Sequence, residues 1–166
     1  VGSEMCIRDR AIMLSGGITV PSYTTYTEED YKYLIEDCEP SLVIVSSYEM
    51  LKKLNNTLNE KKFIKKIITL DEVNKVTNDL NIIDKNKYLD FNTIIKNNLF
   101  DEDKIQNNKL KRTSPACIIY TSGTGGNPKG VILSHGGILN NLVGAFKILK
   151  PIIDSRPVSY THLTLP

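Results

Sequence analysis

The sequence lacks any uninterrupted apolar run long enough to cross a membrane. A spanning helix needs about 20 such residues, and the apolar segments of this 166-residue chain are much shorter. Residues 5–20 combine a basic start with a brief apolar stretch, as secretory leaders do, but that stretch is short and contains glycine. The pattern therefore favours a cytoplasmic protein over a membrane-spanning or secreted one.

Cysteine is also scarce. The chain has three cysteines, and none stands at C-x-x-C spacing from another. Cys38 falls on the apolar face of an expected helix, and Cys117 falls in an apolar run. A zinc site or a disulfide framework needs cysteines at recognisable spacings, so we expect two buried, reduced thiols and no metal site.

An excess of charge of one sign is absent as well. Lysine and arginine together number 21 against 19 acidic residues, for a net charge of +2. Lysine clusters such as residues 61–66 are scarcely interleaved with the aromatic side chains on which nucleic-acid bases would stack. We therefore expect these lysines on solvated faces and predict no nucleic-acid partner.

Two helices are predicted in the first half of the chain. Thr27 and Asp30 have the spacing of a capping box at the start of a helix that Pro40 ends. Ser46 or Ser47 is placed to cap the second helix. The side chains expected to face the core are Tyr31, Leu34, Ile35, Cys38, Leu51, Leu54 and Leu58.

Short β-branched runs lie between these helices and after them. Residues 42–45 are typical of a strand buried on both faces, and a second strand is expected at 64–70. Residues 71–108 are polar and rich in asparagine, so we expect surface there. That stretch carries one amphipathic patch, Phe91, Ile94, Ile95 and Leu99.

The second half repeats the alternation around a glycine-rich segment. Residues 116–120 read as a buried strand, residues 131–133 as a short return strand, and residues 135–149 as a helix with a wide apolar stripe. We assign Tyr120 to the core. We assign His135 to the helix start or to a position that supports the ligand-contacting residues, and direct contact with a ligand is the alternative. Strand and helix alternation predicts an α/β fold with a largely parallel sheet and flanking helices.

The segment after Tyr120 has the composition of a polyphosphate-binding loop. Glycines allow positive φ and bring backbone N–H groups close to an anion, hydroxyls add donors, and one lysine adds a positive charge. A plain hairpin turn is the alternative, but a turn needs neither the hydroxyls nor the lysine between Pro128 and Gly130. The predicted polyphosphate ligands, which the resemblance given below implies are ligands of ATP phosphates, are Thr121, Ser122, Gly123, Thr124, Gly125, Gly126 and Lys129.

Three familiar motifs do not fit this segment. Pro128 precedes the lysine and Gly130 follows it, which excludes a Walker A loop. A dinucleotide fingerprint that starts at Gly123 would need glycine where Pro128 stands. Ser122 lacks the flanking glycines of a nucleophile elbow. Ser134 and His135 are adjacent, so their side chains diverge and do not form a nucleophile and base pair.

Residues 120–131 resemble the phosphate-binding signature Y-T-S-G-T-T-G-x-P-K-G-V of the adenylate-forming enzymes, the AMP-binding acyl-CoA synthetase family. Ten of the eleven specified positions agree, and Gly125 replaces the second threonine. Residues 16–46 are similar to the long-chain fatty acid branch. Peptide-synthetase adenylation domains and luciferase-like enzymes share the signature, and a non-catalytic nucleotide-binding module is a further alternative.

The resemblance implies an ATP-dependent ligase that activates a fatty acid as an acyl-adenylate and passes it to coenzyme A, with Mg²⁺ as cofactor. Peripheral contact with membranes is implied by an apolar substrate. The family's catalytic segments would lie beyond residue 156, so we expect no catalytic residue in this chain and no activity from it alone. Residues 11–156 would be part of the large AMP-binding domain. Residues 1–10 and 157–166 resemble translated sequencing-adapter sequence and are expected to be non-native.

Overall fold

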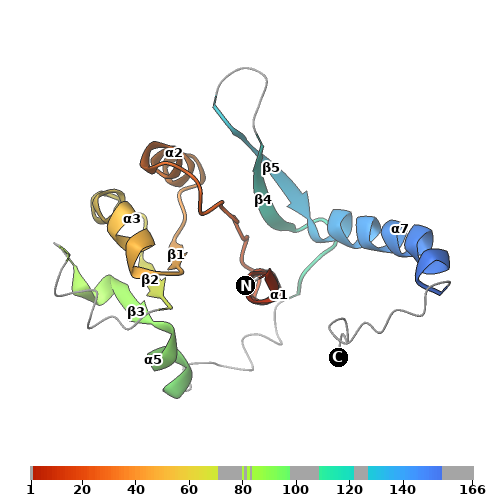
Figure 1. The fold of residues 1–166 in the computed structure, drawn as a ribbon, viewed down its shortest axis with the longest axis horizontal. Coiled ribbons are helices and arrows are strands. Elements are labelled where there is room, and N and C mark those ends of the chain that lie inside the picture. Colours follow the sequence, from red (N-terminus) through yellow and green to blue (C-terminus); the bar gives the residue numbers. More distant parts are fainter. Residues whose placement is uncertain are drawn as a thin grey trace. The chain divides into compact units, whose positions relative to one another are not determined.

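The computed structural model describes residues 2–70, 80, 82, 84–97, 109–121 and 127–154; within residues 2–6 and 152–154 it describes only the backbone. The chain divides into two compact units (Figure 1). One unit is Ser22–Asp103, and the other combines Val1–Pro21 with Lys104–Pro166. None of the described helices is long and apolar enough to cross a membrane.

The unit Ser22–Asp103 is built on a parallel sheet. Its strands are β1 (Leu42–Val45), β2 (Lys66–Thr69) and β3 (Tyr88–Asp90), in the order β1-β2-β3. Both pairings are parallel, which confirms the predicted α/β class and the first two predicted strands. Leu42 is 42% exposed, so the expectation of a strand buried on both faces is wrong for Leu42, because β1 is an edge strand of the described sheet.

Local sequence signals start the two predicted helices of this unit at the expected residues. Helix α2 (Glu28–Cys38) begins with a capping box, in which the Asp30 N–H donates to Thr27 Oγ1 and the Thr27 N–H donates to Asp30 Oδ2. Helix α3 (Tyr48–Glu60) begins at Ser47, whose hydroxyl accepts from the Met50 N–H at 3.3 Å. These bonds satisfy N–H groups that have no partner within the helix.

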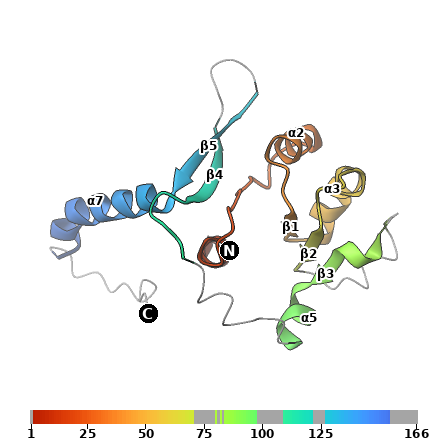
Figure 2. The same cartoon turned by 180° about the vertical axis from the view of Figure 1, so that it is seen from behind.

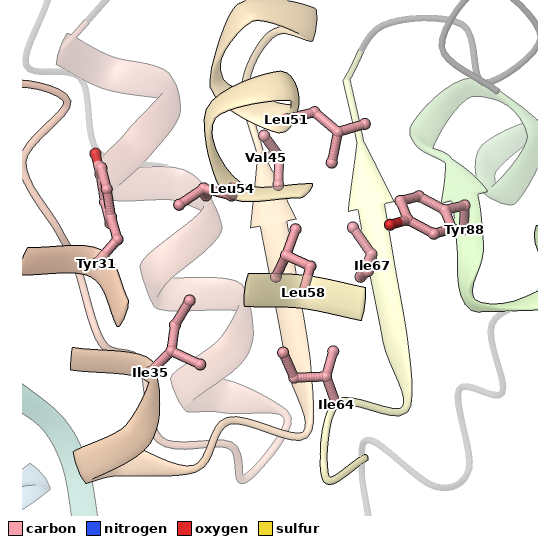
Figure 3. Close-up of a cluster of buried hydrophobic side chains, with 9 residues drawn as sticks. All are labelled: Tyr31, Ile35, Val45, Leu51, Leu54, Leu58, Ile64, Ile67 and Tyr88. Carbon is pink, nitrogen blue, oxygen red and sulfur yellow. The ribbon is translucent and has the colours of Figure 1, made fainter. Parts of the chain in front are cut away.

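A single hydrophobic cluster joins the helices to the sheet (Figure 3). Helix α3 packs against α2 and against β1. Leu51, Leu58 and Ile67 are fully buried, and the predicted inward leucines of α3 are confirmed. The cluster consists of Tyr31, Ile35, Val45, Leu51, Leu54, Leu58, Ile64, Ile67 and Tyr88.

The third strand was not predicted. Residues 71–108 were expected to form surface, and this is wrong for Tyr88, which is 5% exposed and belongs to the core cluster. Its burial is driven by a large apolar ring in an otherwise polar stretch. The short helices η1 (Lys85–Lys87) and α5 (Phe91–Lys96) flank β3. Phe91 and Ile95 are exposed as expected, and Leu99 lies outside the described residues.

The second unit contains an antiparallel ribbon, seen at β4 and β5 in Figure 2. Strand β4 (Pro115–Thr121) and strand β5 (Lys129–Ser134) confirm the predicted pair, and β5 is longer than expected. The expected burial of the first strand is wrong for Ile119, which is 38% exposed. Among the described residues, β4 and β5 form a two-stranded sheet of their own. Thr19 forms an isolated parallel bridge with Cys117.

Two helices complete this unit. Helix α1 (Gly2–Leu14) precedes Thr19, whose hydroxyl donates to Asp9 Oδ1 at 2.9 Å. Helix α7 (His135–Asp154) begins at His135 as predicted and continues past Pro151. Its predicted apolar stripe is largely exposed in this chain, with Leu142 at 64% and Phe146 at 59%.

Candidate functional site

The candidate site lies where β4 ends and β5 begins. The register pairs Thr121 with Lys129 and Tyr120 with Gly130. Residues directly opposite each other in an antiparallel pair project to the same face, with β-carbons about 4.5–5.5 Å apart. The Thr121 hydroxyl and the Lys129 side chain therefore leave the ribbon on one face, beside each other.

Two of the seven predicted phosphate ligands are thus placed by the structure. Thr121 and Lys129 are both exposed at the end of the ribbon. The other five, Ser122, Gly123, Thr124, Gly125 and Gly126, lie outside the described residues. Their assignment stays a prediction, as does the binding role of all seven.

The Lys129 ammonium is available to a ligand as far as the described residues are concerned. None of these residues forms an ion pair or hydrogen bond with it; the salt bridge between Lys61 and Glu36 lies in the other unit. On one face of the ribbon, the Lys129 ammonium supplies a positive charge and the Thr121 hydroxyl supplies an uncharged hydrogen-bond donor. This arrangement can bind an anion.

The opposite face of the ribbon carries a tight contact that the sequence did not reveal. A β-carbon added at Gly130 would lie 2.9 Å from Ile118 Cγ2 and 3.2 Å from Tyr120 Cζ. Tyr120 is 6% exposed, which agrees with its assignment to the core. A glycine inside a strand can mark such a close approach, and that signal could have singled out Gly130.

The other end of the ribbon is tied to the start of α7. The His135 N–H donates to the Ser114 carbonyl at 3.0 Å, and the Gly136 N–H donates to the Arg112 carbonyl at 2.7 Å. The Arg112 guanidinium donates to Asn140 Oδ1 at 2.6 Å. These contacts fix the first turn of the helix against the chain that enters β4.

No hydrogen bond between the side chains of Ser134 and His135 occurs among the described residues. Ser134 Oγ accepts from the Gly137 N–H at 3.1 Å, which uses the hydroxyl to cap the helix. His135 Nε2 is buried and has no hydrogen-bond partner among the described residues. The Ser134 hydroxyl therefore serves the start of α7.

The described residues offer this site neither an activated thiol nor a cluster of metal ligands. Burial raises the pKa of the Cys117 thiol, with a smaller contribution from the negative charge of Asp9, so the nucleophilic thiolate is disfavoured. Cys117 is buried as predicted, whereas Cys38 is only partly buried. No group of three histidine, cysteine or acidic side chains that could hold a metal occurs within the described ranges.

The sequence that contains this ribbon matches a known protein family. The model of a family described as AMP-binding enzyme matches residues 2–165. That range includes both strands of the ribbon and helix α7.

Three curated relatives carry names from two kinds of enzyme. A long-chain-fatty-acid–CoA ligase of Xenopus laevis is 28% identical over 98% of this chain and 22% of its own length. Long chain acyl-CoA synthetase 3 of Arabidopsis thaliana is 30% identical over 98% of this chain and 24% of its length. Tyrocidine synthase 3 of Brevibacillus parabrevis is 31% identical over 84% of this chain and 2% of its length. The chain thus spans less than a quarter of each relative.

A solved structure has a similar fold. The red-emitting luciferase of Phrixothrix hirtus matches with a TM-score of 0.56 and 25% identity, over 75% of this chain and 29% of the luciferase chain. The fold of this chain is therefore found within a longer enzyme.

Proposed function

Because the chain belongs to the AMP-binding enzyme family, we propose that the intact protein is an ATP-dependent acid–thiol ligase. Its substrate would be a fatty acid, and its acyl acceptor would be coenzyme A. Long-chain fatty acids are the first substrates to test. The full-chain similarity to a ligase of Xenopus laevis and to a synthetase of Arabidopsis thaliana supports this choice of substrate. The single observation that carries the proposal is the pairing of Thr121 with Lys129 beside the predicted loop.

The first chemical step would bring two anions together. The fatty-acid carboxylate attacks the α-phosphate of ATP, forming acyl-adenylate and releasing pyrophosphate. Charge builds on the departing pyrophosphate, so fixed positive charge and hydrogen-bond donors near the β- and γ-phosphates lower the barrier. Lys129 and Thr121, with the predicted donors of residues 122–126, would supply them.

The family also implies Mg²⁺, which would neutralise part of the phosphate charge when bound. The described residues contain no cluster of acidic or histidine ligands suited to it. In this chain the role of opposing the phosphate charge falls to Lys129.

The test is acid-dependent exchange of pyrophosphate into ATP by the intact protein. We expect exchange with long-chain fatty acids, and a loss of about ten- to a thousandfold in rate for Lys129→Ala. Lys62→Ala removes an exposed lysine far along the sequence, in the other unit, and should leave the rate unchanged. Equal exchange rates for Lys129→Ala and the wild type would overturn the proposal.

A second candidate is an adenylating enzyme that does not make thioesters of coenzyme A. The similarity of this chain to tyrocidine synthase 3 and to a luciferase supports this second candidate. An intact protein whose exchange depends on amino acids would be a peptide-synthetase adenylation domain, and light emission would indicate a luciferase-like enzyme. ATP binding without any exchange would indicate a nucleotide-binding module.

The domain limits and the cellular site belong to the same proposal. Residues 11–156 would be part of a large AMP-binding domain, with residues 1–10 and 157–166 derived from adapter sequence. The intact protein would be cytoplasmic, with peripheral contact to membranes when it collects its substrate. The genomic reading frame tests the limits, cell fractionation tests the location, and exchange assays of the 166-residue chain should show no activity.

A further inference from the structure

We propose that Tyr120 and Gly130 are positioning residues that act through Lys129. The Tyr120 ring, seated against Gly130, fixes the register of β4 and β5 and so keeps the Lys129 ammonium beside Thr121. This inference rests on the proposed function and adds to it two residues that do not touch the phosphates.

The contact is specific to a glycine opposite an aromatic ring. Tyr120 and Gly130 are directly paired, and the ring approaches the position that a β-carbon would take, at 3.2 Å for Cζ and 3.4 Å for Oη. Ile118 Cγ2 reaches the same position at 2.9 Å. Real β-carbons essentially never show contacts below 3.0 Å, so any larger residue at 130 would displace Ile118 or the ring.

The Tyr120 ring also compensates for the stability that a glycine within a strand loses. Glycine within a strand offers no side chain to pack and loses more conformational freedom than other residues. An aromatic side chain across from a strand glycine can cover it and pin the register. Tyr120 is 6% exposed, although Ile132, the nearest side chain of β5 on the same face, is 64% exposed. The best-packed side chain in this part of the ribbon is therefore the one next to the loop.

Register matters here because side chains alternate between faces. A slip of one residue would carry Lys129 to the face opposite Thr121. Tyr120 and Gly130 belong to that opposite face, so the ring has no direct contact with a ligand held by Lys129 and Thr121. Its effect passes through the pairing of the strands, which makes it a positioning residue and not a catalytic one.

A double-mutant cycle in the intact protein tests the inference. Tyr120→Leu removes the ring, and we expect kcat/KM for ATP in the exchange assay to fall by about a hundredfold, as for a misplaced reactive group. KM for the fatty acid should not change. Tyr120→Phe keeps the ring and should restore most of the activity.

Coupling with Lys129 is the discriminating measurement. If the ring acts by placing the ammonium, Tyr120→Leu in the Lys129→Ala background should cost no more than about threefold, because contacting or coupled residues are not additive. A merely structural role predicts that the two losses multiply. A multiplicative result, or an unaltered kcat/KM in Tyr120→Leu, overturns the inference.

Gly130→Ala provides an independent cycle in case Tyr120→Leu fails to fold. It should reproduce the selective loss in kcat/KM for ATP and the same lack of additivity with Lys129→Ala. Gly144→Ala is its matched control, because a β-carbon there meets nothing within 4 Å. Undiminished exchange in Lys129→Ala overturns the proposed function and this inference together; a slow Lys129→Ala enzyme with multiplicative losses overturns this inference alone.

Discussion

Replacing Gly136 by alanine should loosen the anchor between helix α7 and the segment that enters β4. A β-carbon at this position would lie 2.8 Å from the Arg112 carbonyl oxygen and 3.1 Å from Arg112 Cβ. The carbonyl cannot simply rotate away, because it accepts the Gly136 N–H at 2.7 Å. The Arg112 side chain is also tied to α7, through Asn140.

The expected loss of stability combines two destabilising contributions and one stabilising contribution. Overpacking at a tight contact costs about 1–3 kcal/mol, and a lost hydrogen bond costs about 0.5–1.5 kcal/mol. Alanine returns up to about 1 kcal/mol because it is the better helix former. With the full alanine gain subtracted, Gly136→Ala should therefore lower the free energy of unfolding by about 0.5–3.5 kcal/mol.

Gly144→Ala serves as the control within the same helix. The space around its β-carbon is open, so only the helix-propensity term remains, and stability should rise by up to about 1 kcal/mol. Both variants are compared with the 166-residue chain by urea unfolding followed by circular dichroism. If Gly136→Ala proves as stable as Gly144→Ala, the described contact with Arg112 does not restrain α7 and the reasoning is refuted.

Three further predictions concern the core, the first helix cap and the thiols. Leu58→Ala removes a fully buried side chain and should cost about 2–5 kcal/mol in urea unfolding; a loss below 1 kcal/mol would contradict the packing in Figure 3. Hydrogen bonds from Thr27 hold the pKa of Asp30 below its ordinary value of 3.8. The capping contribution is therefore fully present above pH 3.8 and is lost as pH falls through the lowered pKa, so the stability difference between wild type and Asp30→Asn should vanish in acid. Burial raises the pKa of Cys117, so peptide mapping after iodoacetamide treatment should find it modified more slowly than the partly buried Cys38.

The elements that sequence predicted best are those set by local signals. Thr27 and Asp30 identify a helix start through their spacing alone, because a capping box involves only residues three apart. The run at 42–45 identifies a strand through its β-branched side chains. Neither signal requires knowledge of distant parts of the chain, and both elements begin at the expected residues.

Strand β3 illustrates what local patterns leave out. It has three residues and stands in a polar, asparagine-rich stretch, so no alternation or apolar run announces it. It forms because Ile67 pairs with Tyr88 across the sheet and the Tyr88 ring completes the core cluster. Such pairing depends on a neighbour about 20 residues earlier, which propensity alone does not encode.

The candidate site also has one part that the sequence predicted and one part that it did not. The loop composition could be read from the sequence because glycine, hydroxyl and lysine each have a defined use around a phosphate. The placement of Lys129 inside β5 could not, since the return strand was expected to start at residue 131. Only the register shows that Lys129 faces Thr121 while Gly130 faces Tyr120. Because neighbouring positions project to opposite faces, Lys129 would meet a ligand under the proposed function while Gly130 leaves room for the Tyr120 ring. Substituting either residue should therefore impair ATP use, each for a different physical reason.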